Sequence, residues 1–181
     1  MITSARVEDL PPARTAFALP ALSAAVTLIL AGGIAGFFYA YACSVMFGLD
    51  VIDPRHAMTA MKGINATVRN IFFAPAFFGT PVAALLTALL FHKAGFRTAA
   101  LAMGLAALVY LFGAFLPTVF INVPMNNALA QTAVPESLSE ATRIWTAYAD
   151  RWTWWNVLRT FFSTISLLLV GFSLAAYGSR R

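Results

Sequence analysis

Charged residues are scarce in this sequence. Only 10% of its 181 residues are Asp, Glu, Lys or Arg, whereas about 25% is usual in a soluble globular domain. Four stretches contain none of them: 15–49, 70–92, 98–135 and 160–179. Each is long enough to supply the roughly 20 apolar residues that a helix needs to cross the hydrocarbon core of a bilayer. The scarcity of charge therefore excludes an ordinary soluble domain and predicts an integral membrane protein with four spans.

Cysteine, histidine and the common catalytic motifs are also nearly absent. Cys43 is the only cysteine, which excludes a small secreted module held together by disulfides. The ten-residue segments of alternating polarity that a membrane β-barrel requires are missing. His56 and His92 are the only histidines, and no Cys or carboxylate cluster accompanies either of them. Since no nucleotide-binding loop or nucleophile motif appears either, we expect no metal and no other cofactor.

The apolar runs and their boundaries predict an all-α fold. We expect an integral membrane four-helix antiparallel bundle in one domain over residues 1–181, with spans at about 20–47, 70–92, 98–121 and 155–177. The pair Asp53-Pro54 predicts the start of a further helix outside the bilayer, because an N-cap acceptor precedes a residue that needs no N–H. The last helix is expected to begin near residue 135. At 1.5 Å per residue it outlasts the bilayer, so its first half extends outside.

The positions of the basic residues predict partners and orientation. The net charge is +5, but Lys and Arg stand singly or in pairs at the ends of the spans, which favours lipid headgroups over nucleic acid as their partner. Those in 1–14, 93–97 and 180–181 fall on one side if the spans alternate. The other side carries an equal number together with five acids, and the short loop 93–97 assigns the first side to the cytoplasm. We therefore expect the cytoplasmic membrane of a bacterium, with both termini cytoplasmic. Gly32 and Gly36 fit close packing within the chain or, alternatively, an oligomer interface.

Polar residues recur at helical spacing near one end of the predicted spans. They are Asn65 with Arg69, the amides of 122–127, and the stripe Trp145, Tyr148, Trp152, Asn156 and Arg159. Residues three or four positions apart share a helix face. The amides of 122–127 suit capping and a turn as well as ligand contact, and Tyr39 is a candidate phenol for a cavity. Arg159 stands inside an apolar segment, where an unpaired guanidinium costs several kcal/mol, so it requires a partner or water.

Three motifs together carry a resemblance to a known family. They are Met61-Lys-Gly-Ile-Asn65, Asn122-Val-Pro-Met-Asn126-x-x-Leu129-Ala130 and Trp145-x-x-Tyr148-x-x-x-Trp152-x-x-Trp155-Asn156-x-x-Arg159-Thr160. With them the chain, from about Gly32 to Ala176, resembles the anthrone oxygenase-like membrane proteins, a family once classed as a domain of unknown function. Residues 70–73 read Asn-Ile-Phe-Phe, where the family often has Asn-Pro-x-Phe, and this departure leaves the start of the second span open.

The resemblance implies four membrane helices and, for the characterised branch of the family, oxidation of an anthrone to an anthraquinone by dioxygen without an evident metal or flavin. The ligand would be a hydrophobic aromatic small molecule. Our hypothesis assigns Arg159 and Asn156 to catalysis, as donors to a developing oxyanion. Substrate binding is assigned to Asn65, Arg69, Asn122, Asn126, Tyr148 and Trp152. Asp150 and His56 are the candidates for the proton acceptor.

Two other classes of function compete with an oxygenase. A proton-coupled transporter usually carries an acid within the membrane, and none of the four charge-free runs contains one. A non-catalytic membrane subunit, or a scaffold that binds lipid or quinone, is the stronger alternative, because a buried Asn-Arg network also fixes helices in register without a substrate. A closed and fully paired cluster would indicate a scaffold, whereas an accessible cavity with unpaired amides would indicate a ligand site.

Overall fold

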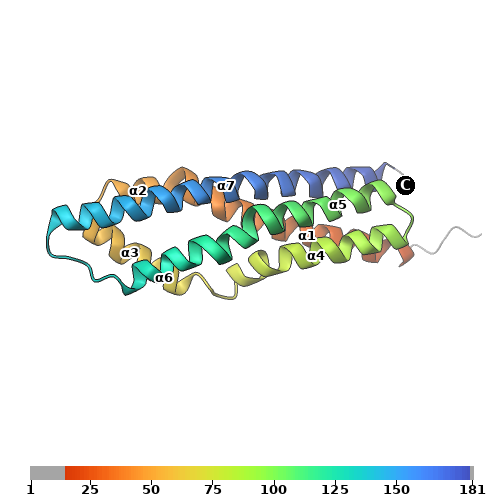
Figure 1. Ribbon diagram of the computed structural model, residues 1–181. Helices are drawn as coiled ribbons and strands as arrows, with labels where there is room; N and C mark the ends of the chain where they lie inside the picture. The colour runs from red at the N-terminus through yellow and green to blue at the C-terminus, as the bar shows by residue number, and fades with distance from the viewer. Residues whose placement is uncertain (1–14, 180–181) are drawn as a thin grey trace, which may run out of the picture.

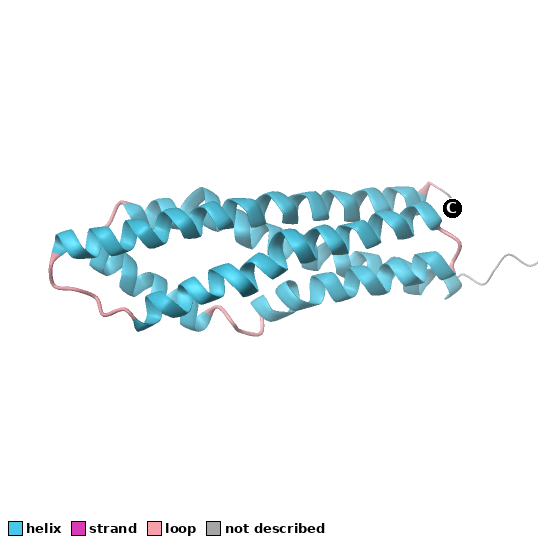
Figure 2. Ribbon diagram, in the orientation of Figure 1, coloured by secondary structure: helices cyan, strands magenta, loops and turns pink. Residues whose placement is uncertain are grey.

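Residues 15–179 are described by a computed structural model, and every element in this range is helical. In chain order the elements are α1 (Thr15–Ala40), η2 (Tyr41–Val45), α2 (Met46–Asp50), α3 (Pro54–Thr67), α4 (Phe73–Lys93), α5 (Arg97–Tyr110), η3 (Leu111–Phe115), η4 (Thr118–Asn122), α6 (Val123–Gln131) and α7 (Leu138–Gly178), where η marks a π-helical turn. Short loops join them (Figure 2). Residues 1–14 and 180–181, on which part of the predicted orientation depends, lie outside the described range.

Four continuous helical runs are long and apolar enough to cross a membrane. They are Leu19–Asp50, Phe73–Lys93, Arg97–Gln131 and Leu138–Gly178. This confirms the all-α fold with four membrane-capable helices. The predicted start of α3 is also correct, because the Asp53 side chain accepts a hydrogen bond from the backbone N–H of Arg55, with Pro54 at the first helical position.

The third helix runs past residue 121, where the third span was predicted to end. It continues to Gln131, so the turn predicted for the amides of 122–127 is wrong and these residues are helical. Proline normally breaks a helix because its ring clashes with the carbonyl four residues earlier. For Pro117 and Pro124 those carbonyls fall in the π-helical turns η3 and η4. The wider turns accommodate both prolines, and the helix passes through.

The second span begins three residues later than predicted. Residues 68–72 are not helical, and α4 starts at Phe73. The reason lies in Asn70, whose Oδ1 accepts hydrogen bonds from the backbone N–H groups of Phe72 (2.9 Å) and Phe73 (3.2 Å). An Asn side chain bonded to the backbone two residues on favours a turn over a helix interior.

The long helices lie side by side along the long axis of the molecule (Figure 1). Figure 1 shows the start of α1 and the end of α7 at one end of the structure. At the other end α2, α3, α6 and the first part of α7 continue beyond the start of α4. These parts form the helical extension that the sequence predicted. Any site that uses the polar stripes must lie where the extension meets the spans.

Hydroxyl groups join neighbouring helices within the apolar part. Thr87 of α4 pairs with Ser23 (2.5 Å) and Thr27 (3.0 Å) of α1. On the other side of the structure, Ser166 and Ser173 of α7 donate to backbone carbonyls of α5 at 2.9 and 2.7 Å. Lipid tails are as apolar as the helix surfaces, so the hydrophobic effect does not drive these helices together. Hydrogen bonds between the helices therefore contribute to their association.

Glycine allows a close helix contact at Gly113, not at the predicted pair. A Cβ added to Gly113 would lie 2.3 Å from the Cβ and Cγ of Phe162, so η3 can approach α7 only without a side chain. A Cβ added to Gly32 or Gly36 would meet nothing within 4 Å. The close packing within the chain that we expected at these two residues is therefore not made.

Polar contacts hold the extension together. Trp145 of α7 donates from Nε1 to Asp50 at the end of α2 (2.8 Å), and Arg55 of α3 donates to the backbone carbonyl of Glu136 before α7 (3.1 Å). The Arg55 guanidinium also pairs with Asp53 and holds the pKa of that carboxyl at about 2. These contacts fix α3 against the start of α7 and so position the end of α3 over the spans.

Candidate ligand-binding site

The third and fourth spans bring polar residues to one depth. With 21 residues, α4 is about 31 Å long at 1.5 Å per residue, which matches the thickness of a hydrocarbon core of about 30 Å. About twenty residues of each other span cover the same thickness. Measured from the end of the molecule that carries the termini, these twenty residues end at Tyr39, Pro117 and Leu158. The amides and the guanidinium of the third and fourth spans stand within a turn or two of this level. They therefore lie at the edge of the apolar layer, level with Phe73.

A cavity of about 340 Å³ occupies this level, at the small end of the range of about 300–1,000 Å³ typical of small-molecule sites. Six of the eight predicted site residues line it: Asn65, Arg69, Asn122, Asn126, Trp152 and Arg159. The rest of the lining is Phe37, Phe38, Tyr41, Val68, Phe73, Phe77, Phe78, Thr118, Val119 and Val123. The other two predicted residues, Tyr148 and Asn156, do not line the cavity but hydrogen bond to residues that do.

Arg159 is the charged group of the site. It is only 3% exposed, and it donates from Nη1 to Thr118 Oγ1 and from Nη2 to Asn156 Oδ1, both at 3.1 Å. Its Cζ stands 4.6 Å from the ring centroid of Phe38 and 5.1 Å from that of Trp152. Among the described residues no acid pairs with it, and its Nε has no partner. Neutral acceptors and ring faces stabilise this cation, but nothing neutralises its charge.

Asn156 fixes the position of that guanidinium. The side chain is fully buried, and while its Oδ1 accepts from Arg159, its Nδ2 donates to the backbone carbonyl of Phe38 at 2.9 Å. The carbonyl of Phe38 points to this amide although it belongs to a helix more than a hundred positions earlier in the chain. Asn156 therefore ties α7 to α1 and holds Arg159 at the cavity wall.

Asn126 is oriented by two donors. Its Oδ1 accepts hydrogen bonds from the Tyr148 hydroxyl (2.8 Å) and from Trp152 Nε1 (2.9 Å). Because an indole N–H can only donate, the amide oxygen must face this pair and the amide nitrogen must face away. The Tyr148 hydroxyl also accepts from Asn65 Nδ2 at 3.4 Å. Within residues 15–179 the Asn126 Nδ2 has no hydrogen-bond acceptor, so it is a donor available to a ligand.

Asn122 supplies the complementary acceptor. Its side chain is 1% exposed. Its Nδ2 donates to the backbone carbonyl of Trp152 at 3.5 Å, while its Oδ1 has no partner among the described residues. A buried acceptor without a partner costs about 1–3 kcal/mol. A ligand hydroxyl close to Asn122 would remove this cost.

Aromatic rings supply much of the apolar lining of the cavity. Phe77 stacks on Phe73 (centroids 5.2 Å apart, 16° between planes) and on Phe115, which lies behind the lining (4.9 Å, 21°). Phe37 contacts the same column of rings through Phe73, at 5.0 Å. Because Phe73 and Phe115 already stack on Phe77, the column offers a ligand apolar contact rather than a free Phe77 face. The lining therefore suits an apolar aromatic ligand with oxygen atoms near Arg159.

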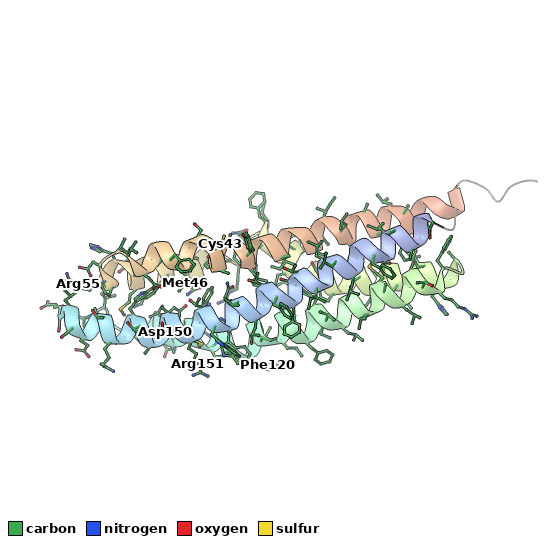
Figure 3. All side chains as sticks on the ribbon, turned by 90° about the horizontal axis from the view of Figure 1, so that it is seen from above. Cys43, Met46, Arg55, Phe120, Asp150 and Arg151 are labelled. Carbon is green, nitrogen blue, oxygen red and sulfur yellow. The ribbon has the colours of Figure 1, made fainter. Side chains whose placement is uncertain are left out.

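Some functional candidates from the sequence lie away from the cavity. Tyr39 is 60% exposed and does not line it, whereas Tyr41, two residues on, does. The proposed proton acceptors Asp150 and His56 are exposed and do not line it either, and Figure 3 shows Asp150 beside Arg151 on α7. In the described part of the chain, no three His, Cys, Asp or Glu residues come together as a metal site would need.

Tyr41, Thr118 and the phenylalanines of the lining were not predicted from the sequence as site residues. Each stands in a run in which almost every residue is apolar, so neither polarity nor period distinguishes the residues that face the cavity. For Thr118 one signal was available, because it precedes Asn122 by four residues and shares its helix face. For Tyr41 no comparable signal exists.

Comparison with known proteins gives one match. The family model described as Anthrone oxygenase matches residues 68–169, which is more than half of the chain. The matched segment contains Arg69, Asn122, Asn126, Asn156 and Arg159, and it begins after Asn65. Comparison with curated proteins and with solved structures gave no match.

Proposed function

The chain belongs to the anthrone oxygenase family, and we propose that it is an integral membrane enzyme that oxidises a hydrophobic polycyclic phenol or anthrone with dioxygen. One observation carries the proposal: the buried Arg159 guanidinium has no acidic partner among the described residues and stands at the wall of a cavity lined by aromatic rings. A ligand that becomes an anion would supply the missing negative charge. We further propose that the protein lies in the cytoplasmic membrane of a bacterium with cytoplasmic termini.

The reaction balances without a metal or an organic cofactor. The methylene carbon of the anthrone loses one proton, and the resulting anion is an aromatic phenolate. Its electron pair forms a C–O bond with dioxygen, and protonation gives a hydroperoxide. The second methylene proton is then lost as the O–O bond breaks, which yields the quinone carbonyl and water. Carbon loses four electrons and dioxygen gains four, so the substrate is the only electron donor.

The residues of the cavity suit these steps. Arg159 would stabilise the phenolate-like oxygen, with Asn126 Nδ2 as a second donor, since fixed donors at a developing oxyanion lower the barrier most effectively in a site without water. Asn156 acts as a positioning residue for Arg159. Asn122 Oδ1 would accept from a ring hydroxyl, and the phenylalanines of the lining would pack against the ring system.

The test is quinone formation by the full chain in membranes supplied with 1,8-dihydroxyanthrone. Anthraquinone absorbance and oxygen uptake are followed together, and autoxidation in membranes without the protein is subtracted. Arg159→Gln is expected to lower the rate by about 10²–10³-fold, the cost of removing an oxyanion donor. Arg151→Gln is the matched control, because Arg151 lies on the same helix but is exposed and does not line the cavity.

Arg159→Lys is the second variant, in case Arg159→Gln does not fold. It keeps the positive charge but lacks the planar guanidinium that bonds both Thr118 and Asn156. It is expected to insert normally and to lose most of the activity. If either folded variant forms quinone at the wild-type rate, Arg159 is not the oxyanion donor. One molecule of oxygen should disappear for each molecule of quinone formed.

A non-catalytic scaffold that binds lipid or quinone is the second candidate. It is favoured by the bonds that Asn156 and Arg159 make to α1 and η4, because these tie three helices together without a ligand. The cavity and its unpaired Asn122 Oδ1 favour a ligand site instead. Wild-type protein that binds 1,8-dihydroxyanthraquinone but takes up no oxygen with the anthrone would establish the scaffold.

A further inference from the structure

The cavity carries a second cation at its rim. Arg69 lies in the loop between α3 and α4, lines the cavity and is exposed. It makes no ion pair or hydrogen bond with the other residues of the described range. Arg69 lies four residues before Phe73, the first residue of the apolar helix α4, which is where lipid headgroups stand beside a helix that spans the hydrocarbon. No Asp or Glu belongs to the lining, so two guanidiniums face one ligand site without a carboxylate.

The apolar side of the rim faces the surroundings of the spans. Phe78 on α4 and Val119 on η4 both line the cavity, and they are 54% and 36% exposed. In a helix that crosses a bilayer, exposed apolar side chains contact lipid. Elsewhere the lining contains Asn126 and Trp152, which are held by the hydrogen bonds that Asn126 Oδ1 accepts from Trp152 and from Tyr148. The lining of the cavity therefore extends to the outer surface of the apolar helices at Phe78 and Val119.

From these two features we propose that the site takes an amphiphilic anion directly from the leaflet. The inference rests on the proposed function and specifies its substrate. The flat aromatic body passes between Phe78 and Val119, its reacting oxygen reaches Arg159, and a second anionic group, such as a carboxylate, stays at Arg69. A guanidinium binds a carboxylate through two parallel hydrogen bonds. An aromatic carboxylate already lies in a leaflet with its charge among the headgroups, so it needs no reorientation to bind.

The charge at Arg69 is tested with two probes that differ only in a carboxylate. They are 1,8-dihydroxyanthraquinone and its 3-carboxylate, bound to the full chain in phosphatidylcholine nanodiscs and followed by quenching of tryptophan fluorescence. The measured quantity is the ratio of the two affinities, because partition into the nanodisc cancels when variants are compared. Arg69→Gln is expected to lower the preference for the carboxylate by up to about fivefold, as an exposed ion pair allows. Arg143→Gln, an exposed arginine away from the cavity, should leave the ratio unchanged.

The outcomes separate this inference from the proposed function. If Arg159→Gln weakens both probes but Arg69→Gln leaves their ratio unchanged, the role of Arg69 is wrong and the proposed function stands. If neither probe binds the wild-type protein, the proposed function fails. Lipid phosphate offers the same chemistry to Arg69. If Arg69→Gln changes binding only in nanodiscs that contain phosphatidylglycerol, Arg69 serves the lipid and the inference is overturned.

The route from the hydrocarbon is tested separately by filling the rim. Val119→Phe narrows the gap beside Phe78 and is expected to slow association of both probes several-fold while their dissociation slows equally. Leu105→Phe is the control, because Leu105 is an exposed residue of α5 that does not line the cavity. Association rates that are the same in both variants and the wild type would show that the ligand arrives by another route.

Discussion

Asn126 gives the sharpest test of the hydrogen-bond network behind the cavity. Its Oδ1 accepts from two donors, the Tyr148 hydroxyl and the Trp152 indole, both on buried side chains. Replacing Asn126 by Ala leaves both donors without their acceptor at once. Each buried polar group left without a partner costs about 1–3 kcal/mol, so the two together cost about 2–6 kcal/mol. We expect the lower half of that range, because Asn126 is only half-buried and water can replace part of the amide.

A double-mutant cycle isolates the two contributions. In a Tyr148→Phe background one of the two donors no longer exists, so Asn126→Ala should cost about 1–2 kcal/mol less than in the wild type. The stability is measured as the free energy of unfolding in mixed micelles titrated with SDS, followed by circular dichroism. Asn127→Ala is the control, since Asn127 is the exposed neighbour and should change the stability by less than about 0.5 kcal/mol.

Either of two results would contradict the hydrogen bonds assigned to Asn126. If Asn126→Ala is no more destabilising than Asn127→Ala, the two donors are not buried as the geometry requires. If the effects of Asn126→Ala and Tyr148→Phe simply add, no interaction energy joins the amide to the phenol. In both cases the orientation of the Asn126 amide, and with it the donor offered to the ligand, would lose its support.

Two further predictions concern packing and acid sensitivity. Gly113→Ala should destabilise the protein by about 1–3 kcal/mol through overpacking against Phe162, whereas Gly171→Ala, with free space around it, should change the stability by less than about 1 kcal/mol; equal effects in the same unfolding assay would contradict this. Arg55 lowers the pKa of Asp53 from 3.8 to about 2, so this pair stabilises α3 above about pH 4 and is lost as the pH falls through 2. Asp53→Asn, which keeps the N-cap acceptor, should flatten the acid-dependent amide exchange of α3, and an unchanged pH profile would refute the pairing.

The sequence was sufficient to locate the four apolar helices, because the bilayer penalises charge at every position of a membrane helix. The four charge-free runs therefore located the four apolar helices, and the N-cap pair at Asp53-Pro54 located α3. The boundaries were less predictable. At Pro124 the sequence indicated a stop, but a π-helical turn in the preceding residues let the helix continue. Such a turn depends on the packing of the whole helix and has no local signal.

The amino-acid sequence by itself determined which residues are apolar enough to enter the membrane and at what depth Asn122, Asn156 and Arg159 stand along their helices. Only the tertiary structure decided which faces of the helices meet, so that Tyr41 and not Tyr39 lines the cavity and Arg159 finds Thr118 and the ring of Phe38. The physical reason is that in lipid an apolar side chain is equally suited to the interior and to the hydrocarbon. Depth is therefore encoded in hydropathy, but the direction that a side chain faces is encoded in packing.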